Sequence, residues 1–458
     1  MATVVNARKA LAINPLKMSQ PLGGAMAFMG VDRCMPLLHG SQGCTAFGMV
    51  LLVRHFREAI PFQTTAMNEV TTILGGLDNL EQACLNIHKR TGCRIIGICT
   101  TGLTETRGED LEGDLRLIRR RQPDLAEVEL VVVSTPDFAG ALEVGWSKAV
   151  AAMVGQIVRT TALSRAQQIN ILAGSHLTPG DIEEIRGMVE AFGLEPIILP
   201  DLAGSLDGHV PDHHIGTTYG GTTVEDILAM GASVHTIAIG AQMRTAAEIL
   251  EAKAGVPFTV LDRLTGLSAV DGFVRLLQDI SGRSAPPRLR RQRSQLEDAM
   301  LDGHFFFGKT KVALAAEPDL LLALSCFLTE LGAEVVAAVA SVESPVLAKV
   351  PTDVVTIGDM DDFEQAATAR GAALLMTHSH GRMVAERLGL PFFRVGFPVF
   401  DRLGAAHQRT VGYAGTRDLI FALGNLLIEH AHEAEPGDWA LDDEPVTQGG
   451  CHASVAAH

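Results

Sequence analysis

Cysteine, aromatic residues and positive charge are all scarce in this sequence of 458 residues. Its seven cysteines, an odd number at irregular spacing, do not suggest a disulfide framework and fit a reducing compartment. Only 37 Lys and Arg accompany 53 Asp and Glu, so the formal net charge is −16 at pH 7. We therefore expect no nucleic-acid partner and no anionic membrane surface as partner, because both require basic protein surfaces.

Long hydrophobic runs are also missing. No uninterrupted apolar stretch approaches the roughly 18 residues of a membrane-spanning helix. The segment from Met1 to Asn14 lacks the continuous apolar core of a signal peptide. We therefore expect a cytoplasmic protein without a membrane partner.

Aliphatic residues dominate what is present. Hydrophobic residues make up 47% of the sequence but aromatic residues only 5%, and the mean hydropathy is +0.21. This composition favours α/β layers packed by Ala, Val, Ile and Leu. Short β-branched runs alternate with longer amphipathic stretches, as in Arg94–Thr100, a helical stretch to Arg121, and Glu129–Ser134. That alternation predicts parallel βαβ units.

The order of these units predicts several domains. A long helical stretch ends near residue 165 and a new strand follows it, so we expect a first α/β domain at 1–165. A second α/β domain is expected at 166–300 and a third at 301–396. A C-terminal segment, 397–458, contains a predicted helix at 416–430. Its end, from residue 433, is acidic and lacks apolar periodicity, which favours disorder.

Cys44 is the candidate functional residue. It follows a loop bracketed by glycines and precedes a predicted apolar helix from Phe47 to Arg57. The positive end of the helix dipole, together with Arg54, His55 and Arg57, would favour the thiolate, the form that binds iron or attacks an electrophile. A lone cysteine at a helix start is, however, more often a small buried hydrophobic residue. The residue pattern alone leaves both interpretations open.

One motif suggests a nucleotide site. The segment from Gly303 to Thr310 matches the phosphate-loop pattern G-x-x-x-x-G-K-[ST]. A working phosphate loop follows a strand and opens a helix, so that backbone N–H groups point at the phosphates. Here a predicted helix precedes the motif and the predicted strand Lys311–Ala316 follows it. The order is reversed, and the interpretation as an NTPase is disfavoured.

The remaining histidines and cysteines carry weaker signals. His378 and His380 follow a predicted strand, where α/β sheets present ligand contacts, although histidines in loops are more often hydrogen-bonded structural residues. His213 and His214, like His452 to His458, could be metal ligands or hydrogen-bonded structural residues. Cys99 ends a predicted strand and its role is open. The other cysteines have no partner at zinc-site spacing and are expected to be packing residues: Cys34, Cys84, Cys93, Cys326 and Cys451.

Five ordered segments connect these observations to a known family. The sequence resembles the β-type subunits of the nitrogenase component 1 superfamily over almost its whole length. The segments that carry the resemblance are Asn14–Gly23, His39–Cys44, Gln63–Glu69 with Leu74–Gly76, Cys99–Glu105 with Gly108–Asp110, and Pro391–Arg402. The resemblance implies three Rossmann-like domains, each a parallel sheet flanked by helices, and a C-terminal helix that packs back on the first domain.

The resemblance also identifies the ligand positions of an iron-sulfur cluster. Catalytic β subunits of the family place three cysteines on a cluster shared with their partner subunit. These positions fall here on Ser19, Cys44 and Gly102. Serine is a much poorer iron ligand than a thiolate, and glycine supplies no side chain. Loss of two ligands on a retained scaffold is typical of the cofactor-assembly branch of the superfamily, which leaves Cys44 as the one implied metal-binding and cofactor-binding residue and implies no catalytic residue.

Membership of that branch would imply partners and cofactors. The chain would pair with a NifE-like α subunit in an α2β2 heterotetramer and share a [4Fe-4S] cluster with it. The precursor of the iron-molybdenum cofactor would be held mainly by the α partner, while a NifH-like iron protein docks. An upstream cluster donor would supply the complex, and apo-nitrogenase would receive its product. The alternatives are a redox-catalytic β subunit of a nitrogenase or of a dark-operative protochlorophyllide reductase.

Overall fold

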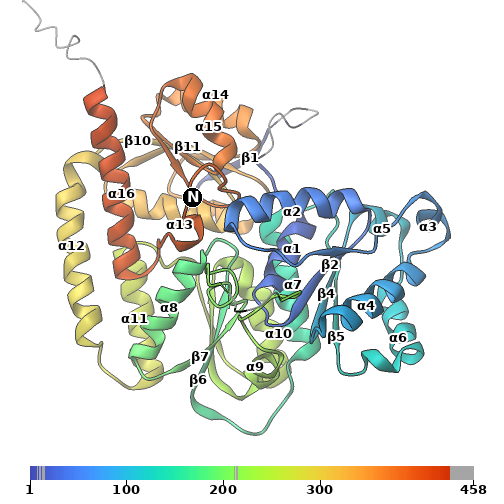
Figure 1. Cartoon of the computed structure of the whole chain (residues 1–458). Helices are drawn as coiled ribbons and strands as arrows, with labels where there is room; N and C mark the ends of the chain where they lie inside the picture. The colour runs from blue at the N-terminus through green and yellow to red at the C-terminus, as the bar shows by residue number, and fades with distance from the viewer. Residues whose placement is uncertain (8, 10–11, 13–15, 211, 213–214, 434–458) are drawn as a thin grey trace, which may run out of the picture.

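Three parallel β-sheets, each flanked by helices, organise the chain in the computed structural model (Figure 1). The structure describes residues 1–7, 9, 12, 16–210, 212 and 215–433. Several central strands are buried along their whole length, among them Cys34–His39 and Ile95–Thr100. Such strands form where helices cover both faces of a parallel sheet. The expected α/β fold with three parallel sheets is confirmed.

The first sheet has the strand order β3-β2-β4-β5. Its strands are β2 (Cys34–His39), β3 (Gln63–Thr64), β4 (Ile95–Thr100) and β5 (Glu129–Val133). The helices of this part of the chain are α1 (Gln20–Met29), α2 (Gln42–Phe56), α3 (Glu69–Leu74), α4 (Leu77–Thr91), α5 (Gly102–Arg107), α6 (Leu111–Arg121) and α7 (Leu142–Ile157).

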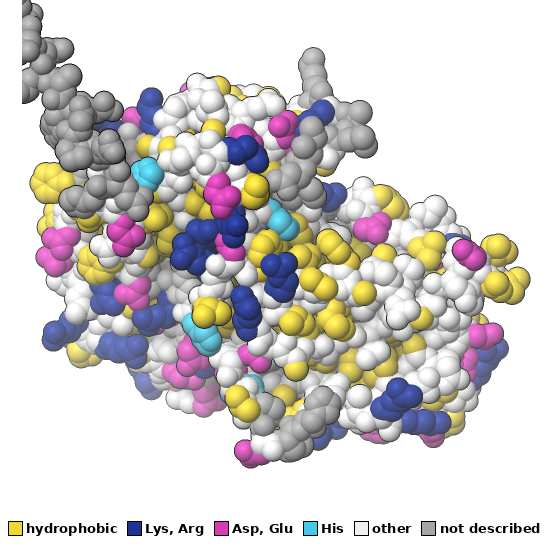
Figure 2. Space-filling view, turned by 45° about the horizontal axis from the view of Figure 1, so that its top comes forward, with side chains coloured by type: hydrophobic (Ala, Val, Ile, Leu, Met, Phe, Trp, Pro, Cys, Tyr) yellow, Lys and Arg dark blue, Asp and Glu magenta, His cyan; other side chains and the backbone are white. Residues whose placement is uncertain are grey.

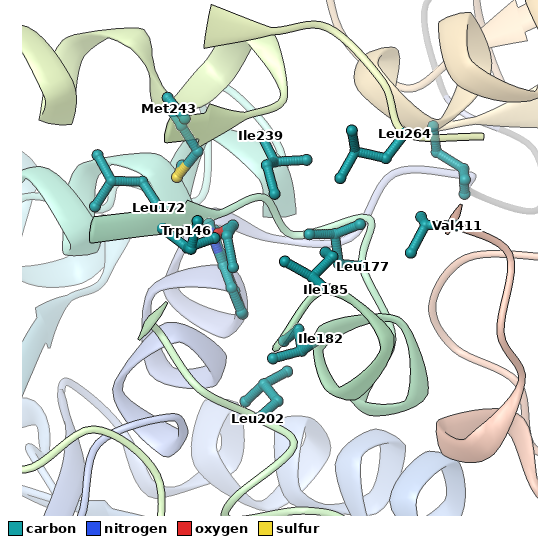
Figure 3. Packing of buried hydrophobic residues seen from close by; sticks show 14 of the residues in the cluster. Trp146, Leu172, Leu177, Ile182, Ile185, Leu202, Ile239, Met243, Leu264 and Val411 are labelled. Atoms are coloured by element: carbon teal, nitrogen blue, oxygen red, sulfur yellow. The ribbon is translucent and has the colours of Figure 1, made fainter. Parts of the chain in front are cut away.

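The second sheet has the strand order β7-β6-β8-β9. Its strands are β6 (Arg165–Ala173), β7 (Glu195–Leu199), β8 (Ser233–Ile239) and β9 (Phe258–Leu261), and its helices are α8 (Pro179–Ala191), α9 (Val224–Ala229), α10 (Arg244–Ala254) and α11 (Leu267–Ser281). The expected domain boundary near 165 coincides with the first residue of β6. The two units share a core, because Trp146 of α7 is fully buried and its indole N–H donates to the carbonyl of Ala173, 2.9 Å away (Figure 3).

The third sheet has the strand order β1-β12-β11-β10-β13-β14. Its strands are β1 (Thr3–Asn6), β10 (Lys311–Ala316), β11 (Glu334–Ala340), β12 (Val354–Ile357), β13 (Leu374–Thr377) and β14 (Phe392–Arg394). The accompanying helices are α12 (Pro287–Phe307), α13 (Pro318–Glu330), α14 (Met360–Arg370), α15 (Arg382–Leu388) and α16 (Gly412–Glu433).

Two features of the third sheet differ from the expected domain limits. Strand β1 pairs with β12 in the register Thr3↔Val354, so the start of the chain belongs to the third sheet and not to the first domain. The expected limit between residues 300 and 301 falls inside α12. Parallel pairing joins strands from any distance along the chain, which is why local patterns did not locate β1.

The C-terminal helix also differs from the expectation. We expected it to pack on the first domain, but α16 packs chiefly against α12, with further contacts to α8 and α11. Its buried stripe contains Leu419, Ile420 and Leu423, and Ile420 lies against Gly303 of α12. The short turn before it, Ala405–His407, contacts α2 of the first domain. The acidic end for which we expected disorder lies outside the described residues from 434 onward.

Among the described residues, no helix combines the length and the hydropathy that crossing a bilayer requires.

Candidate metal centre

Two of the three family ligand positions, Ser19 and Cys44, line one cavity, and the third, Gly102, directly follows another lining residue. Ser19 immediately precedes α1, Cys44 is the third residue of α2, and Gly102 is the first residue of α5. Ser19, Cys44 and Thr101, the neighbour of Gly102, line a cavity of about 370 Å³. Most of the other lining side chains are apolar, including Leu22 and Phe62. The sequence therefore identified three positions that the fold brings together.

Cys44 is the one exposed cysteine among the described residues. Its Sγ lies 3.4 Å from the Oγ of Ser41, the residue that precedes α2. The helix begins at Gln42 and not at Phe47, so Cys44 lies within its first turn. The thiol is thus accessible to a metal ion or cluster from the cavity side.

The basic residues that we expected to favour the thiolate lie elsewhere. Arg54 and His55 are in the last turn of α2, about 15 Å along the helix from Cys44. The Arg54 guanidinium stacks on the Phe400 ring at 4.1 Å, and burial lowers the pKa of His55 to about 4, so its ring is neutral. That part of the electrostatic argument from sequence was wrong. The start of α2 and the side chain of Lys17, which lines the same cavity, are the nearby sources of positive potential.

The other described cysteines are less accessible. Cys34, Cys84, Cys93 and Cys99 are buried, and Cys326 is partly buried. Burial raises the pKa of Cys99 to about 12, and its sulfur lies only 2.9 Å from where a Cβ on Gly24 would stand. Cys99 therefore fills space between β4 and α1. Cys451 lies outside the described residues.

A buried hydrogen-bond network joins the segments that lead into the residues lining the cavity. His39 Nε2 lies 2.7 Å from a carboxylate oxygen of Glu109, and His39 Nδ1 lies 3.0 Å from the hydroxyl of Thr65. The hydroxyls of Thr101 and Thr104 both donate to the carbonyl of His39, at 3.1 and 3.2 Å. Segments that are separate in the sequence thereby fix the starts of α2 and α5 relative to each other.

Glu109 is held ionised by this network. Burial alone would raise its pKa, but the contact with His39, the Gly76 N–H at 3.0 Å and the Arg107 guanidinium together lower the pKa below its usual value. The carboxylate therefore ties the start of α4, the end of α5 and the end of β2 together at neutral pH. Gly76 and Glu109 lie in two of the segments on which the family resemblance rests, and the network joins those segments in space.

Asp137 is a residue of the site that the sequence did not reveal. It lies in the loop after β5 and lines the same cavity as Cys44. A Cβ on Gly102 would lie 2.1 Å from its Oδ1. The only sequence signal was its place after a strand, where α/β folds put ligand-binding residues.

The histidine candidates separate into two kinds. His380 lines the cavity with Cys44, and its ring packs on Phe400. His378 is buried, its Nε2 donates to the carbonyl of Leu16 at 3.1 Å, and burial lowers its pKa to about 4, which indicates a structural role. His213, His214, His452 and His458 lie outside the described residues.

The phosphate-loop motif lies between the end of a helix and the start of a strand, which is the order that argued against a nucleotide site. Gly303–Phe307 form the end of α12, and β10 begins at Lys311, directly after the motif. Lys309 has a φ of 63° and its N–H donates to the carbonyl of Gly332 at 2.8 Å. A helix thus ends at this motif, and its N–H groups point away from any phosphate held there.

Within the cavity, Cys44 is the side chain best suited to bind a metal ion. Within the part of the chain that the structure describes, no group of three or more His, Cys, Asp or Glu side chains could hold a metal ion. Cys44 nevertheless presents an accessible thiol, and exposed apolar side chains accompany it on the surface, with Phe47 exposed to 70% and Phe138 to 67%. Figure 2 shows hydrophobic side chains gathered on this face of the molecule. One thiol cannot hold an iron-sulfur cluster by itself, because such a cluster needs several ligands.

Comparisons with known proteins agree on one family. The family model "Nitrogenase component 1 type Oxidoreductase" matches residues 19–428. The nitrogenase iron-molybdenum cofactor biosynthesis protein NifN of Bradyrhizobium diazoefficiens is 56% identical over 445 residues, covering 96% of this chain and 95% of its own. The protein of the same name from Nostoc sp. is 49% identical over 434 residues, 95% of this chain and 97% of its own.

Solved structures show the same fold. A chain of the structure described as nitrogenase Cp1 at pH 6.5 superposes with a TM-score of 0.90 at 32% identity, covering 94% of this chain and 96% of its own.

Proposed function

We propose that this chain, which belongs to the nitrogenase component 1 family and within it to the NifN group, acts in the assembly of the iron-molybdenum cofactor for nitrogen fixation. It is the β-like subunit of the scaffold complex on which the cofactor precursor is held and completed. The subunit serves as a scaffold and not as an enzyme, and any reductase-type activity would be a residual property of the complex. The alternative, a redox-catalytic β subunit, is not favoured by the names of these relatives or by the ligand positions Ser19 and Gly102.

The observation that carries this proposal is the single accessible thiol among the three family ligand positions. Cys44 supplies one thiolate to a [4Fe-4S] cluster shared with the partner subunit, while Ser19 and Gly102 supply none. One thiolate is enough as this subunit's contribution to a four-iron cluster that is shared across an interface. It is too few ligands for this subunit's half of an eight-iron electron-transfer cluster. The ligand set therefore suits assembly better than catalysis.

The partner is a NifE-like α subunit in an α2β2 heterotetramer. It would cover the exposed apolar side chains beside the cavity, Phe47, Val50 and Phe138, and burial of such a patch favours association. The partner would also bring the remaining cluster ligands and hold most of the cofactor precursor. Residues of this chain then bind one iron through Cys44 and exclude water through Leu22 and Phe62. When bound, the cluster supplies one-electron transfer.

A NifH-like iron protein would dock near the start of α5. Helix α3 has no buried residue, and Val70, Ile73 and Leu74 are exposed on it, Leu74 to 79%. This helix contacts α5, which begins beside the cavity. An exposed apolar helix next to the cluster site is suited to a transient protein partner. The complex would work in the cytoplasm, between an upstream cluster donor and downstream apo-nitrogenase.

Co-expression with the α-type partner tests this proposal. The chain purified alone without oxygen should contain little iron, because one thiolate cannot hold a cluster. The purified complex should contain about four irons per αβ pair in the shared cluster, with a matching EPR signal. A chain that binds a full cluster alone, or a complex in which this cluster is missing, would contradict the proposal.

A further inference from the structure

His380 reaches the cavity of Cys44 from a different part of the chain than the other lining residues. Those residues all lie between positions 17 and 137, whereas His380 belongs to the turn Ser379–Gly381, which follows β13 of the third sheet. Turns that follow the strands of a parallel sheet are where α/β folds place ligand-binding residues. The third domain thus contributes an imidazole to the wall of a cavity in the first domain.

The imidazole ring of His380 is fixed by its neighbours. Its centroid lies 5.0 Å from that of the His378 ring, at an interplanar angle of 89°, and 5.2 Å from that of the Phe400 ring. The backbone N–H of His380 donates to Nδ1 of His378 at 3.3 Å. Phe400 is itself held, because its N–H donates to the Ser379 hydroxyl at 2.9 Å and the Arg54 guanidinium lies 4.1 Å from its ring centre. The ring therefore meets the cavity in a defined orientation.

The two ring nitrogens of His380 have no hydrogen-bond partner among the described residues. Nδ1 is fully enclosed by protein, whereas Nε2 is not enclosed. Burial, together with the positive charge of Arg54, lowers the pKa of His380, so the ring is neutral at pH 7. A neutral imidazole carries one N–H, and an enclosed N–H without an acceptor costs free energy, so the proton belongs on Nε2. His380 thus presents an unused N–H donor at the cavity that contains the Cys44 thiol.

We propose that His380 is a positioning residue for the cluster at Cys44, and that its imidazole N–H donates a hydrogen bond to a sulfur atom of that cluster. This inference rests on the proposed function. Hydrogen bonds to the sulfurs of an iron-sulfur cluster stabilise the added negative charge of the reduced state and so raise the reduction potential. His380 therefore links the third domain to the redox state of a cluster bound in the first.

Removal of the N–H tests this inference in the complex with the α-type partner. His380→Leu should shift the midpoint potential of the cluster to a more negative value, while the iron content stays the same. His380→Gln, whose amide N–H takes the place of the Nε2 donor, should keep most of the wild-type potential. His304→Leu is the matched control, an exposed histidine of α12, and it should leave the potential unchanged. An unchanged potential in His380→Leu, or an equal shift in His380→Gln, would overturn the inference.

A spectroscopic measurement on the wild-type complex does not depend on the folding of a variant. Electron-nuclear double resonance of the reduced cluster, in light and heavy water and with isotope-labelled histidine, should detect an exchangeable proton and a weakly coupled histidine nitrogen. A strongly coupled nitrogen would mean that Nε2 binds iron directly, and no coupled nitrogen would mean no contact; either result contradicts the inference. Failure of the proposed function is distinct, because the complex would then contain no cluster that depends on Cys44.

Discussion

At the residue scale, the side chain at position 19 controls how many thiols face the cavity. Ser19 precedes α1 and makes no capping hydrogen bond through its side chain, so replacing its hydroxyl should cost little stability. Ser19→Cys should therefore give a folded complex in which a second thiol of this subunit faces the cluster. We expect an altered EPR spectrum with unchanged thermal stability.

The control for this change is Ser147→Cys, on α7, away from the cavity, which should leave the spectrum unchanged. An identical spectrum for wild type and Ser19→Cys would mean that position 19 does not face the cluster. Gly102→Cys is a further probe, because Gly102 does not have a left-handed φ and the nearby Asp137 oxygen is the free end of a flexible side chain.

The sequence predicted part of this site. Cys44, Ser19 and Gly102 could be identified because each lies in a segment that resembles the family. Asp137 could not, since its proximity to Gly102 arises only when β4 and β5 pair and place their following loops together. The expectation that Arg54, His55 and Arg57 favour the Cys44 thiolate failed for a related reason. Closeness in sequence along a helix of 15 residues is not closeness in space.

At the element scale, the crossing of α1 and α7 positions one wall of the cavity. A Cβ on Gly23 would lie 1.9 Å from the carbonyl oxygen of Leu142, and one on Gly145 would lie 1.9 Å from that of Gln20. The two helix backbones thus touch, and only glycine permits this at either position. Because Gln20 also holds the loop of Asp137, the crossing determines the geometry of the site.

Gly145→Ala should separate these helices. Overpacking of this kind typically destabilises a protein by about 1–3 kcal/mol, so we expect a lower melting temperature. Displacement of α1 should also broaden or shift the EPR signal of the cluster. Gly187→Ala is the matched control, a helical glycine of α8 with no atom within 4 Å of the added Cβ, and it should be neutral or slightly stabilising. Equal stability of the two variants would contradict the close crossing.

Element boundaries were predicted unevenly. The strand Lys311–Ala316 was predicted with its observed limits, because a short apolar run has clear polar ends. Helix α8 begins at Pro179 instead of Asp181, since Thr178 caps it and Asp181 completes the capping box. Helix α7 ends at Ile157, earlier than expected, where Val158 turns to an extended conformation and Thr160 and Thr161 disfavour helix.

At the scale of the whole molecule, three carboxyl groups meet where the domains join: Glu143 and Asp319 are buried, and Glu317 is partly buried. Glu143 belongs to α7, while Glu317 and Asp319 lie at the start of α13, and the Asp319 N–H donates to Glu143 at 3.0 Å. Burial raises the pKa of Glu317 to about 7 and that of Asp319 to about 6, and burial with neighbouring charge raises the pKa of Glu143. These groups are stabilised in the neutral form.

This cluster predicts a pH dependence of stability. Because the folded pKa of Glu317 exceeds its unfolded value near 4.5, the folded state binds more protons, and stability falls as pH rises between these values. Glu317→Gln should therefore stabilise the complex at pH 8, on the order of 1–3 kcal/mol, and have little effect near pH 4.5. Calorimetry at both pH values, with the exposed Glu251→Gln as control, measures this. A stabilisation independent of pH would contradict the assignment.

The central claim is that Cys44 is the one thiolate this subunit gives to a shared cluster, and Cys44→Ala tests it most directly. The variant should be co-expressed with the α-type partner, purified without oxygen, and compared with Cys326→Ala, which removes a thiol distant from the cavity. We predict that Cys44→Ala loses most of the four-iron EPR signal and its iron, while Cys326→Ala retains both. A Cys44→Ala complex with unchanged iron content and spectrum would contradict the account.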